Sequence, residues 1–447
     1  MAMRPARGMR DFLPEDVRRR EYVVRVIRDV YDHYGFEPLE TPAVENIDTL
    51  LGKYGDEGNK LIFKILKRGE HEASGQADLA LRYDLTVPLA RVVAEHQATL
   101  PKFFKRYQIQ PVWCADRPAR GRFREFYQCD IDAIGSGSLL VEAEMCAAAS
   151  DALTQLGFTD FTIRLNHRGL LTQLLSLSGL PEGQHSAALI AIDKLDKAGR
   201  EVVISELMGI GTASINAGRL LAMFLMDDGD TNEHKLKRLR AFFENSLVQP
   251  DALIELSRLL KLCAGTSAGP HLQLDPSLAR GLSYYTGAIM EIHLPDLAGS
   301  VGGGGRYDNL IGTFLGRKVP ACGFSLGLER ILVVMDERKM FPEAVAGRSA
   351  DVMVTLWNDA SQADALALAA VLRRAGHRVD VYPEPDKLGK QLKYASSRGI
   401  PLVTVVGDDE RAAGTVMVRD LRSGEQQPVS MVEVPAYVSQ RLAREST

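Results

Sequence analysis

One stretch, Phe104 to Gly135, most constrains how this chain can fold, because two runs with strand character flank a loop rich in cations. The first run, 106–113, mixes aromatic and β-branched residues, which favours a strand. The second run, 123–134, alternates in polarity, and successive side chains of a strand point to opposite faces. The stretch therefore predicts a β-hairpin whose loop carries Arg117, Arg120 and Arg122.

One face of the second strand combines residue types that are unusual on a solvated surface. Alternation places cations, an aromatic ring, an amide and two carboxylates together: Arg122, Arg124, Phe126, Gln128, Asp130 and Asp132. Such a face can hold a ligand that is anionic at one end and cationic at the other, such as an amino acid beside ATP. The alternative is a solvated antiparallel edge, in which alternating charges stabilise the sheet modestly.

Length, charge and cysteine content limit the class of protein. The chain has 447 residues and a net charge of -4, so it should form roughly three domains without a global positive field for nucleic acid. It contains five cysteines but no CxxC spacing, which argues against a disulfide framework and a zinc site. We see no signal peptide and no apolar run near the roughly 20 residues that span a bilayer. These features predict a soluble, cytoplasmic protein that has no membrane partner.

Changes in residue pattern and composition along the chain predict its domain organisation. Residues 1–167 mix helix and strand patterns, whereas 168–270 is leucine- and alanine-rich and reads as a helical insertion. Strand patterns return over 271–336, and 337–348 resembles a linker. Residues 349–447 begin with alternating strands and helices, which is typical of an α/β unit with parallel central strands.

Three further motifs are ambiguous when taken alone. The glycine run 302–305 lacks the lysine and Ser/Thr of a phosphate-binding loop, and a tight turn between strands is its commoner cause. Arg280 precedes two tyrosines, Tyr284 and Tyr285, in a predicted strand. Arg330 opens a predicted helix, where the helix dipole disfavours a cation; this mismatch indicates a function.

Two basic clusters are candidates for local phosphate contacts, although solvated helix faces are their commoner explanation. One lies in the insertion and the other near the C-terminus: Lys235, Lys237, Arg238 and Arg240, and Lys387, Lys390, Lys393 and Arg398.

Taken together, these segments resemble the histidyl-tRNA synthetases, a family of class II (subclass IIa) aminoacyl-tRNA synthetases, along almost the whole chain. RGMRDFLP and FEPLETP resemble motif 1, and FKRYQIQPVW with GRFREFYQCDIDAIG resembles motif 2. ARGLSYYTG and GGRYD resemble the two histidine signatures, CGFSLGLERI resembles motif 3, and KLGKQLKYASSRGIP resembles the anticodon module. Each signature is weak alone, but the ordered set is highly specific.

The resemblance implies a fold and an activity. The fold would be α+β: an antiparallel catalytic sheet of about six strands flanked by helices, a helical insertion, and a C-terminal α/β anticodon-binding domain. The protein would be a homodimeric ligase that uses ATP and Mg²⁺ to activate L-histidine and transfers it to tRNA(His).

The resemblance also implies roles for individual residues. Asp84, Thr86 and Gln128 would bind the α-amino group of histidine. Asp132, with Tyr284 or Tyr285, would read the imidazole, and Arg280 would be catalytic, holding the carboxylate and the α-phosphate. On the ATP side, Arg122 would meet the terminal phosphates while Phe126 and Arg330 sandwich the adenine. The metal ligands stay unknown.

The chain departs from the family pattern at two positions. Cys114 occupies the place of an arginine that clamps the α-phosphate and carboxylate, and a neutral thiol cannot replace a bidentate guanidinium. Ser283 replaces an acid, which a short polar residue should tolerate. Three hypotheses stay open: an active enzyme with reshaped phosphate binding, a weakened synthetase, and a paralogue that binds histidine or a partner without charging tRNA, like the regulatory subunit of histidine biosynthesis.

Overall fold

The computed structural model describes residues 3–53, 59–69, 74–192, 199–226, 229–244, 250–278, 284–342, 345 and 348–443. The chain divides into two compact units, Met1–Phe341 and Pro342–Thr447. Among the helices of these ranges, none combines the length and the apolar character needed to cross a membrane.

An eight-stranded sheet forms the centre of the first unit. Its inner pairs are antiparallel, as predicted, whereas the two outermost pairs are parallel. The prediction of about six strands was too low, because the edge strands are only two and three residues long and leave no periodic signal. In spatial order the strands are β1 (Glu37–Pro38), β5 (Phe104–Trp113), β6 (Glu125–Ile134), β11 (Ala321–Gly327), β10 (Ser300–Arg306), β9 (Ala288–His293), β7 (Thr162–His167) and β8 (Leu272–Leu274).

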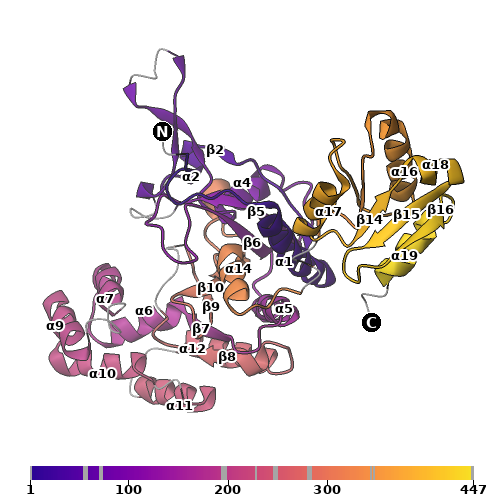
Figure 1. Ribbon diagram of the computed structural model, residues 1–447. Helices are drawn as coiled ribbons and strands as arrows, with labels where there is room; N and C mark the ends of the chain where they lie inside the picture. Colours follow the sequence, from indigo (N-terminus) through magenta and orange to yellow (C-terminus); the bar gives the residue numbers. More distant parts are fainter. Residues whose placement is uncertain are drawn as a thin grey trace. The chain divides into compact units, whose positions relative to one another are not determined.

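Helices cover one face of this sheet: α1 (Pro14–His33), α5 (Leu140–Gln155) and α14 (Leu328–Glu337) (Figure 1). Pro14 is at the start of α1, where its missing N–H costs nothing. Cys129 and Ile131 of β6 are fully buried in the core beneath these helices. By alternation, the polar side chains of β6 point to the opposite face.

Shorter elements lie beside that opposite face. The helices α2 (Ile47–Leu50), α4 (Thr86–Glu95) and α13 (Gly312–Leu315) bury a second, smaller core. A three-stranded antiparallel sheet accompanies them: β2 (Val44–Asn46), β4 (Ala77–Leu81) and β3 (Lys64–Leu66).

The glycine run forms strand β10 in the middle of the large sheet, not a tight turn. Glycine is required there because neighbouring strands approach too closely for side chains. A Cβ on Gly304 would lie 2.1 Å from the carbonyl oxygen of Gly323, and one on Gly323 would lie 2.0 Å from Asp132 Oδ1.

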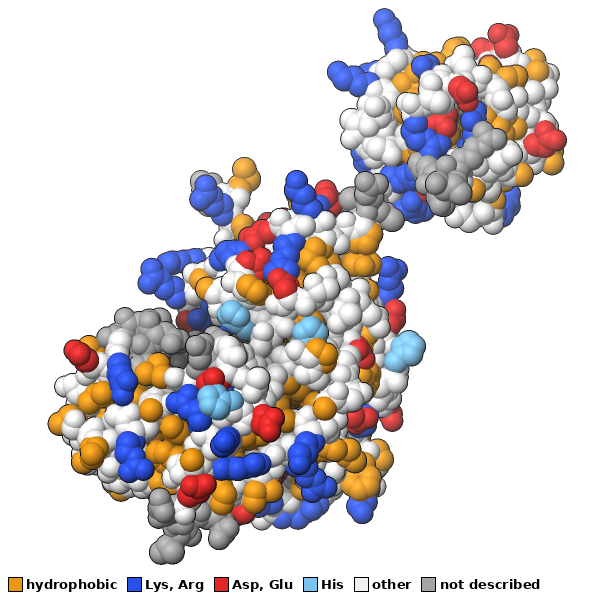
Figure 2. Space-filling view, turned by 90° about the horizontal axis from the view of Figure 1, so that it is seen from below, with side chains coloured by type: hydrophobic (Ala, Val, Ile, Leu, Met, Phe, Trp, Pro, Cys, Tyr) orange, Lys and Arg blue, Asp and Glu red, His pale blue; other side chains and the backbone are white. Residues whose placement is uncertain are grey.

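Helices occupy the described part of 168–270, gathered beside β7 and β8 in Figure 1. Figure 2 shows Lys and Arg side chains scattered among hydrophobic ones on the side seen from below. Lys235 does not belong to a solvated basic cluster, since it is buried, and Arg238 donates to the carbonyl of Ala222 at 3.0 Å. The helices are α6 (Arg168–Leu177), α7 (His185–Ile192), α9 (Arg200–Ile210), α10 (Ser214–Phe224), α11 (Asn232–Phe243) and α12 (Asp251–Cys263).

The second unit contains a five-stranded sheet, β13-β12-β14-β15-β16. The predicted parallel centre is confirmed, and two antiparallel strands extend one side. The helices α16 and α19 pack on one face and α17 on the other. The bounds are β12 (Val352–Val354), α16 (Gln362–Arg374), β13 (Val379–Val381), α17 (Leu388–Ser397), β14 (Leu402–Val405), α18 (Asp408–Ala413), β15 (Thr415–Asp420), β16 (Gln426–Ser430) and α19 (Val434–Ala443).

Candidate active site

The polar face of β6 forms the base of a cavity of about 240 Å³. All of the residues predicted to bind histidine line this cavity except Arg280, which falls outside the described residues. The structure thus brings together residues that are far apart in the sequence: Asp84, Thr86, Gln128, Asp132, Tyr284 and Tyr285.

At one end of this cavity, Asp132 belongs to a buried charge network that the sequence did not reveal. Its Oδ2 atom lies 2.7 Å from Nη2 of Arg106, a guanidinium with no solvent exposure. The hydroxyl of Tyr307 donates to the other oxygen, Oδ1. Burial raises the pKa of Asp132, and the attraction of Arg106 opposes that rise. The carboxylate is therefore already held on both sides by protein groups.

At the other end, the segment before α4 joins β6. The side-chain oxygen of Gln128 accepts from the backbone N–H of Leu85 at 3.2 Å, and its nitrogen donates to the hydroxyl of Ser325 at 3.3 Å. Asp84 accepts from the N–H of Val87 at 3.0 Å. These bonds fix the positions of two predicted ammonium ligands relative to each other.

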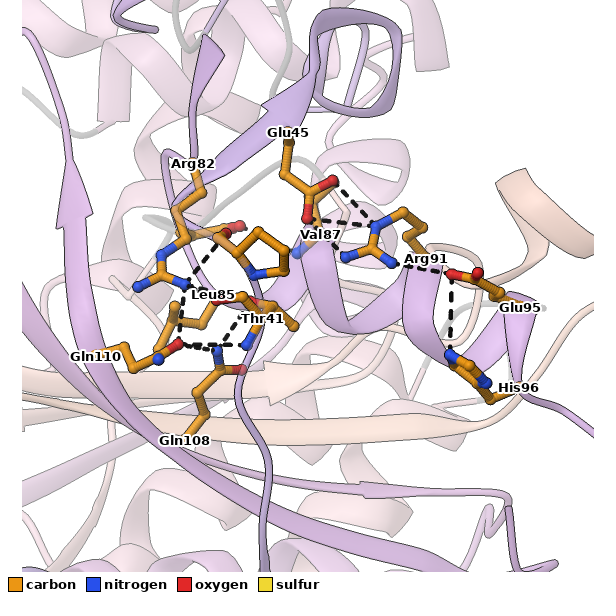
Figure 3. A network of polar contacts seen from close by, with 12 residues as sticks. Thr41, Glu45, Arg82, Leu85, Val87, Arg91, Glu95, His96, Gln108 and Gln110 are labelled. Carbon is orange, nitrogen blue, oxygen red and sulfur yellow. Dashed lines mark hydrogen bonds and ion pairs between the residues drawn. The ribbon is translucent and has the colours of Figure 1, made fainter. Parts of the chain in front are cut away.

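A second polar network anchors that segment to the sheet (Figure 3). Arg82, which is buried, donates to the carbonyl of Thr41 at 2.6 Å and to Gln110 Oε1 at 2.9 Å. Farther along α4, Arg91 donates to Glu45 at 2.8 Å. Since Arg82 lies two residues before Asp84, this network limits the movement of the cavity wall.

A second cavity, of about 320 Å³, adjoins the first. The residues predicted to bind ATP all line it: Cys114, Arg122, Phe126 and Arg330. Both cavities are bordered by Asp84, Gln128, Gly303 and Ser325. Two ligands that fill them would therefore be in contact.

Cys114 is almost completely buried in the wall of the second cavity and is hydrogen-bonded to Tyr83. Burial raises the pKa of its thiol, so the group is neutral at physiological pH. Arg120 does not replace the missing charge, because it donates to Glu337 at 3.0 Å and to the carbonyl of Asp296 at 3.0 Å.

The cations that line this second cavity are Arg122 and Arg330. The Arg122 side chain is 54% exposed and pairs with Asp116. Arg330 donates to the carbonyl of Ser300, and burial lowers its pKa. Gly121, at φ +67°, turns the hairpin loop against Arg330, so that an added Cβ would lie 3.2 Å from Cγ of Arg330.

Glu329 is a further buried carboxylate that the sequence did not single out. It accepts from the N–H of Tyr127 at 2.9 Å, and burial raises its pKa to about 7. Asp116 lines the same cavity. Within the described ranges, no group of three or more His, Cys, Asp or Glu residues is placed to hold a metal ion. Any ion in this cavity would therefore need ligand oxygens of its own, as Mg²⁺ has when it is bound to ATP phosphates.

Comparisons with known proteins agree along the whole chain. The family model for histidyl-tRNA synthetase matches residues 8–331, and an anticodon binding domain model matches 351–441. The histidine–tRNA ligase of Cytophaga hutchinsonii is 41% identical, covering 96% of this chain and 97% of its own. That of Gloeobacter violaceus is also 41% identical, covering 97% and 98%. A crystal structure of histidyl-tRNA synthetase from Nostoc sp. PCC 7120 superposes with a TM-score of 0.80 at 32% identity, covering 99% and 100%.

Proposed function

The chain belongs to the histidyl-tRNA synthetase family, and we propose that its two adjoining cavities bind L-histidine and ATP. It is a histidine–tRNA ligase, an aminoacyl-tRNA synthetase. The observation that carries the proposal is the shared border of the two cavities. A carboxylate can attack an α-phosphate efficiently only when both ligands are held in contact and in line.

In the first step, a carboxylate oxygen of histidine attacks the α-phosphorus of ATP. The new O–P bond forms as the bond to pyrophosphate breaks, which gives histidyl-adenylate. Negative charge accumulates on the phosphate oxygens, and preorganised cations stabilise it. In the second step, the terminal hydroxyl of tRNA(His) attacks the carbonyl carbon and AMP leaves.

On the amino-acid side, Asp84, Thr86 and Gln128 bind the α-ammonium group. The bond between Gln128 and the Leu85 backbone supports this role, because it joins the two elements that carry the ligands. Arg280 holds the carboxylate and the α-phosphate as the catalytic residue. Asp132, with Tyr284 or Tyr285, contributes the imidazole end of the cavity.

On the ATP side, Phe126 and Arg330 enclose the adenine while Arg122 meets the terminal phosphates. Cys114 offers no charge to the α-phosphate, so adenylation is weakened relative to a chain with arginine there. Mg²⁺ bound to the ATP phosphates would neutralise part of their charge. Asp116 and Glu329 are the carboxylates of this cavity that would hold it, and oxygen donors suit the ion.

The remaining partners follow from the same family. The second unit binds the anticodon of tRNA(His), and the exposed cations of α17 and its flanks contact RNA phosphates: Lys387, Lys390, Lys393 and Arg398. The enzyme acts as a homodimer in the cytoplasm, where its tRNA substrate is used. A regulatory paralogue is less well supported, because the relatives that match nearly the whole of this chain, including the region matched by the anticodon binding domain model, are histidine–tRNA ligases.

Histidine-dependent ATP–pyrophosphate exchange tests the proposed activity. We expect Arg280→Ala to abolish exchange while histidine still binds in equilibrium dialysis. Undiminished exchange in this variant would contradict the catalytic assignment. Deletion of 349–447 should spare exchange but severely reduce charging of tRNA, and equal loss of both would mean that this unit is structural.

A further inference from the structure

Strand β7 ends beside the segment that leads into the first histidine signature, and one of its side chains is bound to that segment. Asn166, the next-to-last residue of β7, has no solvent exposure. Its Nδ2 atom donates to the carbonyl oxygens of Pro276 and Leu278, at 3.0 Å each. Leu278 is buried and lines the amino-acid cavity. A side chain that does not line the cavity therefore holds the backbone of one of its walls.

The sequence of this segment explains why an amide is needed. Strand β8 ends at Leu274, and the N–H of Asp275 still donates to the carbonyl of Leu165 on β7 at 2.9 Å. Pro276 has no N–H, so the pairing with β7 stops there. Buried carbonyls beyond this point need other donors, because a carbonyl without a partner is costly in the interior. The amide of Asn166 carries two N–H groups on one nitrogen and serves both carbonyls.

The end of β7 also holds the exit of the segment 276–287. The backbone N–H of Arg168, two residues after Asn166, donates to the carbonyl of Gly287 at 2.9 Å. The exit is therefore held by a backbone donor, which no side-chain substitution removes. The entrance is held by the side chain of Asn166, and a substitution there can release it.

We propose that Asn166 is a positioning residue for the formation of histidyl-adenylate. It fixes the backbone at Leu278, two residues before the proposed catalytic Arg280, and it contacts no substrate itself. A displacement of about 1 Å caused by a mutation far from the reacting atoms can reduce a rate about 10²-fold. This inference rests on the proposed function, because it assumes that Arg280 and this cavity wall act on histidine and ATP.

The first test is Asn166→Leu in the full-length chain, because leucine has a similar shape but no donor. We expect kcat for histidine-dependent pyrophosphate exchange to fall about 100-fold. The KM for histidine should rise less, by up to about tenfold, since Leu278 belongs to the wall of that cavity. The KM for ATP should stay within about twofold, because neither Asn166 nor Leu278 lines the nucleotide cavity.

Ser150→Ala is the matched control. Ser150 is also fully buried, and its hydroxyl donates to the carbonyl of Ser267 at 2.9 Å, but it lines neither cavity. Both variants lose buried bonds from a side chain to a carbonyl, so both should have a lowered Tm. Well below that Tm, Asn166→Leu should lose kcat and Ser150→Ala should keep it. A kcat for Asn166→Leu within twofold of the parent, or a loss equal to that of Ser150→Ala, would overturn the proposal.

Asn166→Asp extends the test to a side chain of the same shape. Burial favours the neutral carboxyl, which has one O–H donor in place of two N–H donors. Its kcat should therefore lie between those of the parent and Asn166→Leu. If Asn166→Leu does not fold, a parental kcat in Asn166→Asp would overturn the proposal.

Hydrogen–deuterium exchange tests the two bonds of Asn166 without any substrate. Amides of the segment 277–288 should take up deuterium faster in Asn166→Leu than in the parent, and at the parental rate in Ser150→Ala. If this difference is seen but the parent has no pyrophosphate exchange activity, the proposed catalytic function fails. If the parent is active and deuterium uptake in Asn166→Leu is parental, or is faster with an unchanged kcat, the role of Asn166 fails.

Discussion

The two adjoining cavities share a border but hold their charges in opposite ways. Asp132 lines the amino-acid cavity and is buried together with its ion-pair partner Arg106. In the nucleotide cavity, Arg122 is more than half exposed and pairs with Asp116 at the surface. A buried pair recognises a small ligand by fixed geometry, whereas an exposed arginine can leave its partner to meet phosphates. Mutations of the buried pair beside the amino-acid cavity should therefore lower the free energy of unfolding. Mutations in the nucleotide cavity should instead change the kinetics of the reaction.

The most severe test of this difference is Arg106→Met. Removing one member of a buried ion pair leaves the other charge unpaired, which costs about 3–5 kcal/mol of the free energy of unfolding. Arg122→Met is the matched control, and its stability should stay within about 0.5 kcal/mol of the parent because its partner is solvated. Urea unfolding measures both. Equal losses would mean that the two cavities do not differ in this way.

Cys114→Arg tests whether a charge in the nucleotide cavity controls the rate of pyrophosphate exchange. Restoring a cation to the buried wall of the nucleotide cavity should raise the rate of pyrophosphate exchange by about 10² to 10³. Cys114→Ser, which adds no charge, should stay within a few fold of the parent. An unchanged rate in Cys114→Arg would mean that phosphate binding has been reshaped around other groups.

Glu329 is an exception, since it lines the nucleotide cavity but is buried. Because burial raises its pKa from 4.5 to about 7, the folded protein binds a proton there that the unfolded chain releases. Stability that is fully present below pH 4.5 is therefore lost as the pH rises through 7, by up to about 3 kcal/mol. The melting temperatures of Glu329→Gln and the parent should be similar near pH 4.5, separate between pH 4.5 and 7 with the variant more stable, and keep a constant difference above pH 7. Parallel curves would contradict this.

Arg330→Met gives the smallest expected effect. Loss of a cation beside the adenine should raise the KM for ATP about 10- to 30-fold, as expected for a desolvated cation–π contact. The KM for histidine should not change. Arg120→Met is the control, because its guanidinium is bound to Glu337 and should not contribute to ATP binding. A matching rise in the KM for histidine would show that the cavities are not independent.

The sequence predicted which residues line the two cavities, but it did not predict the buried groups that surround those residues. Period-two alternation correctly grouped Phe126, Gln128 and Asp132 on one face of β6, because a strand offers only two faces. Alternation could not identify Arg106 as their buried counter-ion. That residue lies on the paired strand β5, opposite Asp132 in register, and register depends on tertiary structure.

This dependence on tertiary structure also explains two wrong predictions from the sequence. The glycine run was read as a turn because glycine weakens isolated strands, whereas contact between backbones requires it at this position. Lys235 was grouped with solvated cations because charge alone does not show which side of a helix faces the core. Both errors arise where packing between distant segments outweighs local preference.

The paired glycines beneath the amino-acid cavity also restrict how substrate choice can be redesigned. At Gly304 and Gly323 there is no side chain left to remove, and any addition collides with backbone or with Asp132. Substitutions of these two glycines can therefore only shrink the cavity or distort the sheet. Room for bulkier histidine analogues must come from lining residues that have side chains to shorten, such as Leu278 and Tyr284.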